Sequence, residues 1–250
     1  MKTWTPLPTR STHTQTWRKL DLSVWDEVLN IAHRGYAREW PGNTLEAIEG
    51  AISLGVDAVE VDVQETGDEG FILAHDWTVQ GRAICELTLG EAMGLDVGGG
   101  CTAPTLEEAL DLCRGEVGVA LELKEVRTLG RLLEIVRSSG EEGKTGMCSF
   151  DAELLRGVRE QGSGLRLGLI TDAPPPDPES VLRELGCEVI GVRAPHISEG
   201  LVKRVQGSGR MVFGWGMEDA AGVSAVLGLG VDGLVSDFPD VVKEVLGRGG

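Results

Sequence analysis

Carboxylates and a lysine recur at alternate positions of two apolar segments, a pattern that suits chemistry on an anionic substrate. In residues 58–63, AVEVDV, the valines point to one face of a predicted strand, and Glu60 and Asp62 point to the other. The segment LELK further along the chain repeats this pattern with Glu122 and Lys124. Strands covered by helices have no solvated face, so the three acids are predicted to line a buried cleft and to need a cation. We therefore expect a hard metal ion, Mg²⁺ or Ca²⁺, beside an anionic substrate.

Two basic side chains lie close to these acids in the predicted arrangement. Arg34 follows the apolar segment that ends in His33, and Lys124 closes LELK. A planar guanidinium matches phosphate oxygens and a lysine adds a compact charge, so both are predicted to bind a phosphate. The alternative is a structural ion-pair network, but three acids against two bases still leave an excess of negative charge.

The chain has four histidines, and three of them follow apolar strands closely. Any one of His33, His75 and His196 alone would more often be structural. Beside the carboxylates, His33 and His75 are predicted to act as general acid and base, because an imidazole titrates near neutral pH.

Two aromatic residues stand at predicted strand ends. Trp215 ends MVFGW and Phe150 ends GMCSF. Core packing is the ordinary role of such residues, and the alternative is an apolar wall for the part of a ligand that is not phosphate. Trp215 is the stronger candidate for substrate binding.

Composition excludes several classes of function. The 250 residues carry a formal net charge of −17, which argues against binding to nucleic acid or to an anionic membrane without other help. Five widely spaced cysteines without a CxxC pair indicate reduced thiols rather than disulfides or a zinc site. No signal-like segment is visible, and no apolar stretch approaches roughly 18 residues. We therefore expect a cytoplasmic protein without integral membrane association.

Apolar runs and helical patterns alternate eight times, which predicts parallel strands that close into a (β/α)₈ barrel. The site of such a barrel forms at the carboxyl ends of its strands, where the candidate residues lie. Residues 28–250 are assigned to the barrel, and residues 1–27, with three of the six tryptophans, to an N-terminal extension packed on it. A short excursion with one extra strand, FILAH, is predicted after the second strand. The strands are predicted at 29–33, 58–63, 119–124, 146–150, 166–170, 189–192, 211–215 and 233–236, and the helices at 43–54, 105–113, 129–138, 152–161, 178–185, 198–206, 218–227 and 240–246.

The motifs, taken together, resemble those of the glycerophosphodiester phosphodiesterases over roughly residues 29–245. The combination of HRG, ExD, HD and ExK in this order is highly specific. The motifs that carry the resemblance are HRG (33–35), PGNT (41–44), GVDAVEVDV (55–63), AHD (74–76), PTLEEAL (104–110), LELK (121–124), SF (149–150), WG (215–216) and GVDGLVSDFPD (230–240).

The resemblance implies a metal-dependent (β/α)₈ enzyme that hydrolyses a glycerophosphodiester to sn-glycerol 3-phosphate and an alcohol. In the mechanism proposed for the family, the glycerol 2-hydroxyl attacks phosphorus, the alcohol leaves with a proton from a histidine, and water opens the cyclic phosphate. Carried over by position, the metal ligands are Glu60, Asp62 and Glu122, the acid and base pair is His33 and His75, and the phosphate-binding residues are Arg34 and Lys124.

One position departs from the family. Gly42 in PGNT stands where the family usually has a glutamate, and Glu39 and Glu46 are candidates to reach the same space. Two other functions remain open, a lysophospholipase D acting on lysolipids and an inactive barrel that binds a phosphorylated ligand. The alcohol, the preferred metal, the division of roles between the histidines and the oligomeric state also remain open.

Overall fold

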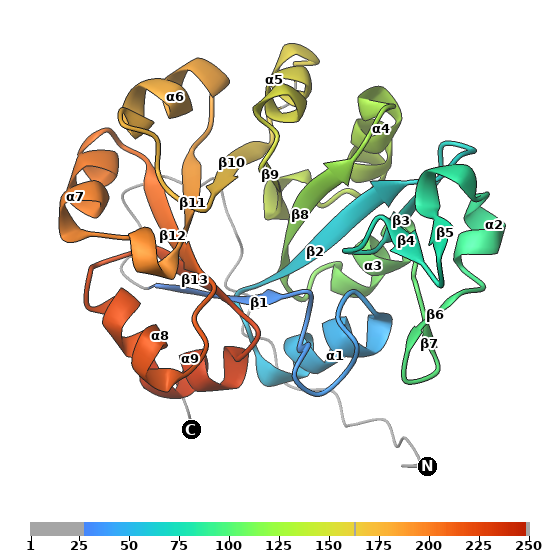
Figure 1. Cartoon of the computed structure of the whole chain (residues 1–250), viewed down its shortest axis with the longest axis horizontal. Helices are drawn as coiled ribbons and strands as arrows, with labels where there is room; N and C mark the ends of the chain where they lie inside the picture. The colour runs from blue at the N-terminus through green and yellow to red at the C-terminus, as the bar shows by residue number, and fades with distance from the viewer. Residues whose placement is uncertain (1–27, 163, 249–250) are drawn as a thin grey trace.

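Eight parallel strands form a closed barrel in the computed structural model, which describes residues 28–162 and 164–248 (Figure 1). Each strand pairs with the next around the barrel, and the last pairs with the first. The strands, in this order, are β1 (Leu29–His33), β2 (Ala58–Glu65), β8 (Gly118–Glu125), β9 (Thr145–Ser149), β10 (Arg166–Thr171), β11 (Val189–Arg193), β12 (Met211–Trp215) and β13 (Gly233–Ser236).

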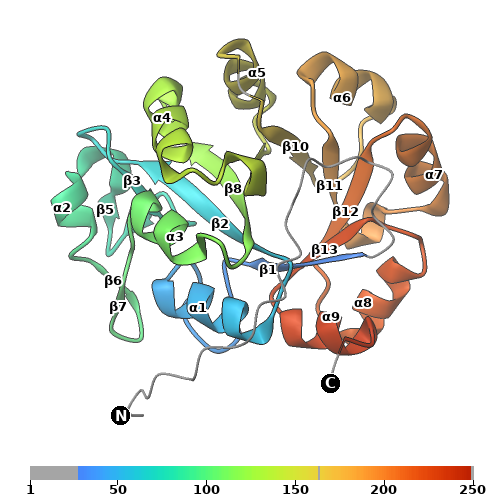
Figure 2. The same ribbon diagram turned by 180° about the vertical axis from the view of Figure 1, so that it is seen from behind.

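A helix follows each barrel strand, and these helices surround the barrel (Figures 1 and 2). The predicted barrel is confirmed, and the predicted element ends lie within about two residues of those observed. The helices are α1 (Leu45–Leu54), α3 (Leu106–Cys113), α4 (Leu129–Ser139), α5 (Ala152–Glu160), α6 (Pro178–Leu185), α7 (Glu199–Gly207), α8 (Ala220–Leu227) and α9 (Pro239–Val245).

The start of α1 differs from the helix expected at 43–54. Thr44 is the N-cap, and its side chain accepts a hydrogen bond from the backbone N–H of Ala47. Asn43 precedes the cap with a φ of 61°, so its side chain is free for a different role. Gly55 ends the helix in the left-handed conformation at φ 79°, as expected from its position before β2.

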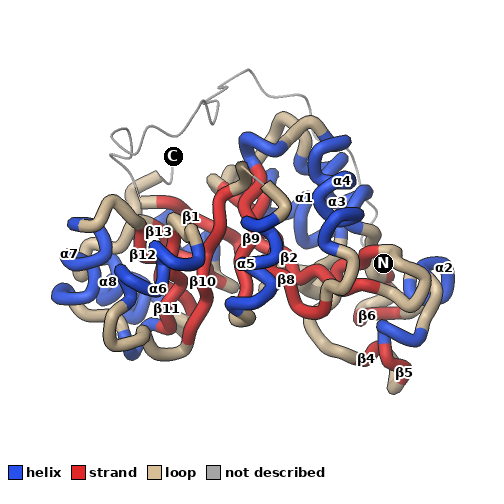
Figure 3. The backbone as a smooth tube through the Cα atoms, turned by 90° about the horizontal axis from the view of Figure 1, so that it is seen from above, coloured by secondary structure: helices blue, strands red, loops and turns tan. Residues whose placement is uncertain are grey.

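The excursion between β2 and α3 is built from short elements that lie together at one end of the molecule (Figure 3). Its first strand, β3, pairs antiparallel with the end of β2, which confirms the extra strand predicted in FILAH. The elements are β3 (Phe71–Leu73), β4 (Thr78–Val79), β5 (Arg82–Ala83), η1 (Ile84–Glu86), α2 (Leu89–Ala92), β6 (Asp96–Gly98) and β7 (Cys101–Thr102). The two remaining short helices, η2 (Glu142–Lys144) and η3 (Ala194–His196), lie beside β9 and β11 in the chain.

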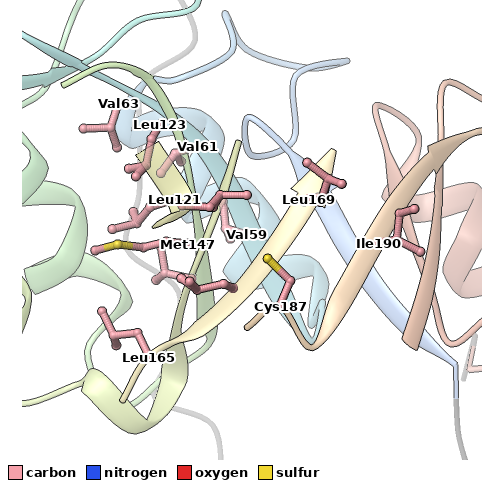
Figure 4. Packing of buried hydrophobic residues seen from close by; sticks show 14 of the residues in the cluster. Val59, Val61, Val63, Leu121, Leu123, Met147, Leu165, Leu169, Cys187 and Ile190 are labelled. Atoms are coloured by element: carbon pink, nitrogen blue, oxygen red, sulfur yellow. The ribbon is translucent and has the colours of Figure 1, made fainter. Parts of the chain in front are cut away.

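The main hydrophobic core fills the layer between the barrel strands and the helices. Val59, Val61 and Val63 of β2 belong to it and are at most 1% exposed (Figure 4). Because side chains alternate along a strand, the same placement turns Glu60 and Asp62 toward the barrel interior. The core therefore fixes which face of β2 carries the acids.

One expectation concerns residues outside those that the structure describes. The N-terminal extension expected to pack on the barrel, residues 1–27, lies outside the described residues. Among the helices of the described residues, none combines the length and the apolar character needed to cross a membrane.

Candidate active site

Three buried carboxylates from two neighbouring strands converge at the carboxyl end of the barrel. Glu60 and Asp62 come from β2, and Glu122 comes from β8, where it pairs in register with Asp62. One carboxylate oxygen from each residue lies within 4.8 Å of the other two. The three acids therefore converge as predicted, close enough to share one cation.

The charge balance of this cluster fits a divalent cation. Burial, and then the charge of Asp62, raise the pKa of Glu60 to about 8. Burial also raises the pKa of Glu122. The Oε1 atom of Glu60 is buried without a hydrogen-bond partner among the described residues. A hard cation with oxygen ligands would remove both costs, so these residues fit a divalent metal ion.

Among the described residues, Asp62 forms ion pairs with two basic side chains, Lys124 and Arg34. Lys124 Nζ lies 3.1 Å from Asp62 Oδ1 and also forms an ion pair with Glu122. Arg34 Nε lies 3.0 Å from Asp62 Oδ2. The predicted bases therefore meet the predicted acids, but two positive charges leave one negative charge when all three acids are ionised.

The backbone of the HRG motif aims Arg34 at the cluster. Arg34 has a φ of 57°, and its backbone N–H donates a 3.0 Å hydrogen bond to Glu60 Oε2. Gly35 follows at φ 81°, where an added Cβ would lie 2.6 Å from the backbone of Ala47. Only glycine fits this close approach to α1, which gives the motif glycine a structural reason.

Gly42 makes room for Arg34. A Cβ at Gly42 would lie 3.0 Å from Arg34 Cβ and 3.3 Å from Arg34 Cδ, both tight contacts. A glutamate here would therefore require the Arg34 side chain to shift. Glu39 and Glu46, the residues considered as replacements, are not members of the acidic cluster in the part of the chain that is described.

With Glu46 three residues further on, the sequence favours Asn43 as the N-cap of the helix expected at 43–54, but the structure makes Asn43 a site residue. Its Nδ2 donates a 2.7 Å hydrogen bond to Asp62 Oδ2, and its Oδ1 accepts one of 3.0 Å from the backbone N–H of Asp62. Asparagine tolerates the left-handed conformation that this position requires. Asn43 therefore orients Asp62 rather than capping α1.

His33 forms a pair with Asp237, which the sequence analysis did not single out. His33 Nδ1 lies 2.6 Å from Asp237 Oδ1, and Nε2 lies 3.9 Å from Glu60 Oε2. Burial lowers the pKa of His33, but the hydrogen bond with Asp237 and the charge of Glu60 outweigh it, so the pKa is raised above 6.5. The same bond lowers the pKa of Asp237. An ionised Asp237 accepts from Nδ1 and leaves Nε2 facing the cluster.

His75 lies in the loop after β3. The buried side chain of Gln64 forms hydrogen bonds with the residues immediately before and after His75. Gln64 Nε2 donates hydrogen bonds to the carbonyl oxygens of Ala74, at 2.9 Å, and Asp76, at 2.8 Å. His75 Nδ1 lies 2.8 Å from Asp76 Oδ1. Gln64 continues the alternation of Glu60 and Asp62 on β2, a signal that was present in the sequence.

One cavity of about 650 Å³ opens beside these groups. Asp62 is fully buried and lies behind the ion pairs of Arg34 and Lys124. Trp215, at the end of β12, packs edge-on against Phe150 at 5.8 Å, and its Nε1 is buried without a hydrogen-bond partner among the described residues. The other seven predicted site residues all line this cavity: His33, Arg34, Glu60, His75, Glu122, Lys124 and Trp215.

Known proteins match this chain over most of its length. A glycerophosphodiester phosphodiesterase of Caldanaerobacter subterraneus is 27% identical and aligns with 90% of this chain and 100% of its own length. One from Arabidopsis thaliana is 29% identical over 87% of this chain and 73% of its own.

Solved structures show the same fold. A phosphodiesterase of Oleispira antarctica, in complex with the product sn-glycerol-3-phosphate, superposes with a TM-score of 0.76 at 24% identity, over 87% of this chain and 96% of its own. A glycerophosphodiester phosphodiesterase of Agrobacterium tumefaciens gives a TM-score of 0.77 at 24% identity, over 87% of this chain and 100% of its own.

The family model decides the assignment that the motifs suggested. The model of the glycerophosphoryl diester phosphodiesterase family matches residues 33–241, a span that runs from the first site histidine to the start of α9. The resemblance drawn from the motifs, and the enzyme class that it implies, are confirmed. The chain belongs to the glycerophosphoryl diester phosphodiesterase family.

Proposed function

We propose that this protein hydrolyses glycerophosphodiesters to sn-glycerol 3-phosphate and an alcohol. The observation that carries the proposal is the arrangement of three acidic residues, two basic residues and two histidines at one cavity. The names of the relatives support the reaction, and the product bound to the Oleispira antarctica phosphodiesterase supports sn-glycerol 3-phosphate.

Glu60, Asp62 and Glu122 would hold one divalent cation, Mg²⁺ or Ca²⁺. When bound, this ion supplies positive charge to the phosphoryl oxygens as negative charge builds on them. Asn43 keeps the carboxylate of Asp62 in place through two hydrogen bonds. Burial of the three acids keeps water from competing for their oxygens.

Arg34 and Lys124 would bind the phosphate of the substrate. Each already forms an ion pair with the acidic cluster, so each charge is held at the cavity wall before substrate arrives. Their side chains are 28% and 15% exposed, which leaves both accessible from the cavity. Preorganised charges cost little reorganisation when the reaction begins.

His33 and His75 would carry the protons. In the first step one imidazole accepts the proton of the glycerol 2-hydroxyl as its oxygen attacks phosphorus, and the other gives a proton to the departing alcohol oxygen. In the second step the roles reverse: a water molecule loses a proton to the imidazole that gave one in the first step and opens the cyclic phosphate, and the released ring oxygen receives a proton from the imidazole that accepted one. The two steps together leave both histidines as they began.

A turnover assay tests this proposal. Release of glycerol 3-phosphate from glycerophosphoethanolamine and glycerophosphocholine should be lost with a chelator and return with Mg²⁺ or Ca²⁺. His33→Ala and His75→Ala should each lower kcat by roughly 10²- to 10⁴-fold. The matched control is His196→Ala, since His196 is an exposed histidine of η3.

Either histidine variant with the activity of the native chain would refute the acid and base assignment. Calorimetry measures whether the protein binds Mg²⁺ and glycerol 3-phosphate, and it therefore separates ligand binding from catalysis. Binding of both without any turnover would favour the inactive, ligand-binding barrel.

A further inference from the structure

The interior of this barrel is only partly filled with side chains. Barrel interiors of this kind are ordinarily packed with bulky branched residues. Here β1, β12 and β13 supply large residues, among which Ile31, Phe213 and Val235 pack together. Four neighbouring strands on the opposite wall each place a small residue at the middle inward position: Ala120 on β8, Cys148 on β9, Gly168 on β10 and Gly191 on β11.

The resulting cavity runs along the barrel from the site to the opposite end. Its lining includes His33 and Lys124 at the carboxyl ends of the strands. It also includes Lys144 in η2 and Gly146 at the start of β9, which lie at the other end. The space is therefore elongated and continuous with the candidate active site.

The middle of the cavity is apolar. The charged residues in its lining belong to the site or to the opposite end, where Glu142, Lys144 and Arg166 lie. Between these ends the described lining side chains are apolar or glycine, apart from Thr145 and Ser236. The apolar residues that are nevertheless partly exposed to solvent include Ala120, Ile170, Phe213 and Val235.

Apolar walls that water can reach favour an apolar ligand. Water forms no hydrogen bonds with apolar walls, and covering these walls with apolar atoms of a ligand lowers the free energy. The volume of 650 Å³ lies in the range of about 300–1,000 Å³ that is typical of small-molecule sites. Apolar walls that lead away from the phosphate-binding candidates Arg34 and Lys124 match a linear chain attached to a phosphate.

The mouth continues this apolar surface outward. Phe150 is 48% exposed and packs against Trp215, and both line the cavity beside Lys124. Lys124 Nζ lies 6.0 Å from the centre of the Phe150 ring. A phosphate near Lys124 therefore lies next to an aromatic surface that leads into the interior.

We propose that the barrel interior binds a linear apolar chain carried by the phosphodiester substrate, while its phosphate stays at the mouth. The substrate class is then a glycerophosphodiester with an alkyl or acyl chain. This inference rests on the proposed hydrolysis, since the phosphate is placed by Arg34 and Lys124. The chain sits either on the leaving alcohol, so that hydrolysis releases sn-glycerol 3-phosphate, or on the glycerol, so that the phosphate product keeps the chain.

Binding of alkyl phosphates tests the interior without turnover. Calorimetry in the presence of Mg²⁺ compares ethyl, octyl and dodecyl phosphate below their micellar concentrations. Each buried methylene should tighten binding by about fourfold, so octyl phosphate should bind at least roughly a hundredfold more tightly than ethyl phosphate. Equal dissociation constants for the ethyl and octyl compounds would overturn the inference.

Filling the cavity at Gly191 tests its location. A Cβ at Gly191 meets no neighbour closer than 3.8 Å, so Gly191→Leu adds a side chain inside the channel. We expect the ratio of octyl to ethyl affinity to fall by at least about tenfold. If the leucine variant folds poorly, Gly191→Ala replaces it, because alanine needs less space. It should lower the ratio of octyl to ethyl affinity by a smaller factor.

Gly207→Leu is the matched control, because Gly207 is exposed at the end of α7 and an added Cβ there meets nothing within 4 Å. It should keep the affinity ratio of the native chain. A ratio that Gly191→Leu leaves unchanged would contradict the channel.

Turnover then identifies the carrier of the chain. The assay compares an octyl ester of glycerophosphate with a lysophospholipid of the same chain length, and glycerophosphoethanolamine serves as the short reference. Hydrolysis of the reference without any dependence on chain length would refute the channel but keep the proposed function. Binding that depends on chain length, without hydrolysis of any diester, would keep the channel and refute the proposed function.

Discussion

His33 Nδ1 lies 2.6 Å from Asp237 Oδ1, although 204 positions of sequence separate the two residues. His33 ends β1 and Asp237 follows β13, and these strands pair with each other to close the barrel. The site therefore depends on contact between the first and last strands. A histidine held in one tautomer by a carboxylate is ready to use its other nitrogen for proton transfer.

Replacing Asp237 with Asn should weaken catalysis through His33. The amide keeps the shape of the side chain but removes the charge that raises the pKa of His33. We expect kcat to fall by about 10- to 100-fold, less than the loss of the histidine itself. The pKa of His33 should also fall, whether His33 acts as acid or as base, so its limb of the pH–rate profile should move to lower pH.

The measurement is the pH dependence of kcat/KM with saturating metal, beside an NMR titration of His33. Asp240→Asn is the control, because Asp240 is a nearby acid that pairs with Arg38 instead. A pH profile of Asp237→Asn that overlays that of the native chain would show that the bond does not tune His33.

Gln64→Leu should displace His75. The leucine cannot donate, so the carbonyl oxygens of Ala74 and Asp76 on either side of His75 lose their partner. We expect kcat to fall by about tenfold or more, because small displacements of a catalytic group are costly. The free energy of unfolding should fall by about 1–3 kcal/mol, since a buried group is left unpaired.

Gln206→Leu separates the two effects. Gln206 Nε2 also bridges two oxygens, the carbonyl of Gly230 and Asp232 Oδ1, but it is exposed and lies outside the cavity lining. This variant should change stability slightly and leave kcat unaltered. If Gln64→Leu loses only stability, measured by urea unfolding, and keeps its kcat, Gln64 has no role in positioning His75.

The sequence predicted the parts of the site that periodicity encodes. Alternation in AVEVDV indicated that Glu60 and Asp62 share a face, and the valines on the other face pack in the core as expected. LELK indicated the same for Glu122 and Lys124. Since residues at the carboxyl ends of parallel strands meet at one rim, the convergence of these groups followed from the barrel.

The missed residues depend on contacts and conformations that periodicity does not encode. Asn43 looked like a helix cap because a glutamate follows three residues later, but Thr44 has the competing and better placed hydroxyl. Asp237 acts only through a partner from the opposite end of the chain. The hollow interior depends on which small residues face inward on four strands at once, which requires the registers of the whole sheet.

The raised pKa of Glu60 predicts a pH-dependent effect of metal on stability. Burial first, and the charge of Asp62 second, raise this pKa from 4.5 to about 8. Between these values the folded chain holds a proton that the unfolded chain has lost, so without metal this group destabilises the fold as pH rises. A bound cation requires the ionised carboxylate, and its affinity should therefore increase up to about tenfold per pH unit until pH 8.

Thermal unfolding with and without Mg²⁺ or Ca²⁺ measures this effect. At a fixed excess of metal, the stabilisation should grow by up to about 1.4 kcal/mol per pH unit between pH 6 and about pH 8, and level off above it. Glu60→Gln should flatten the dependence, because the amide has no proton to release. Glu244→Gln, at an exposed position of α9, should retain it. A metal-induced shift in Tm that is the same at pH 6 and pH 8 in the native chain would show that no ligand is protonated before the ion binds.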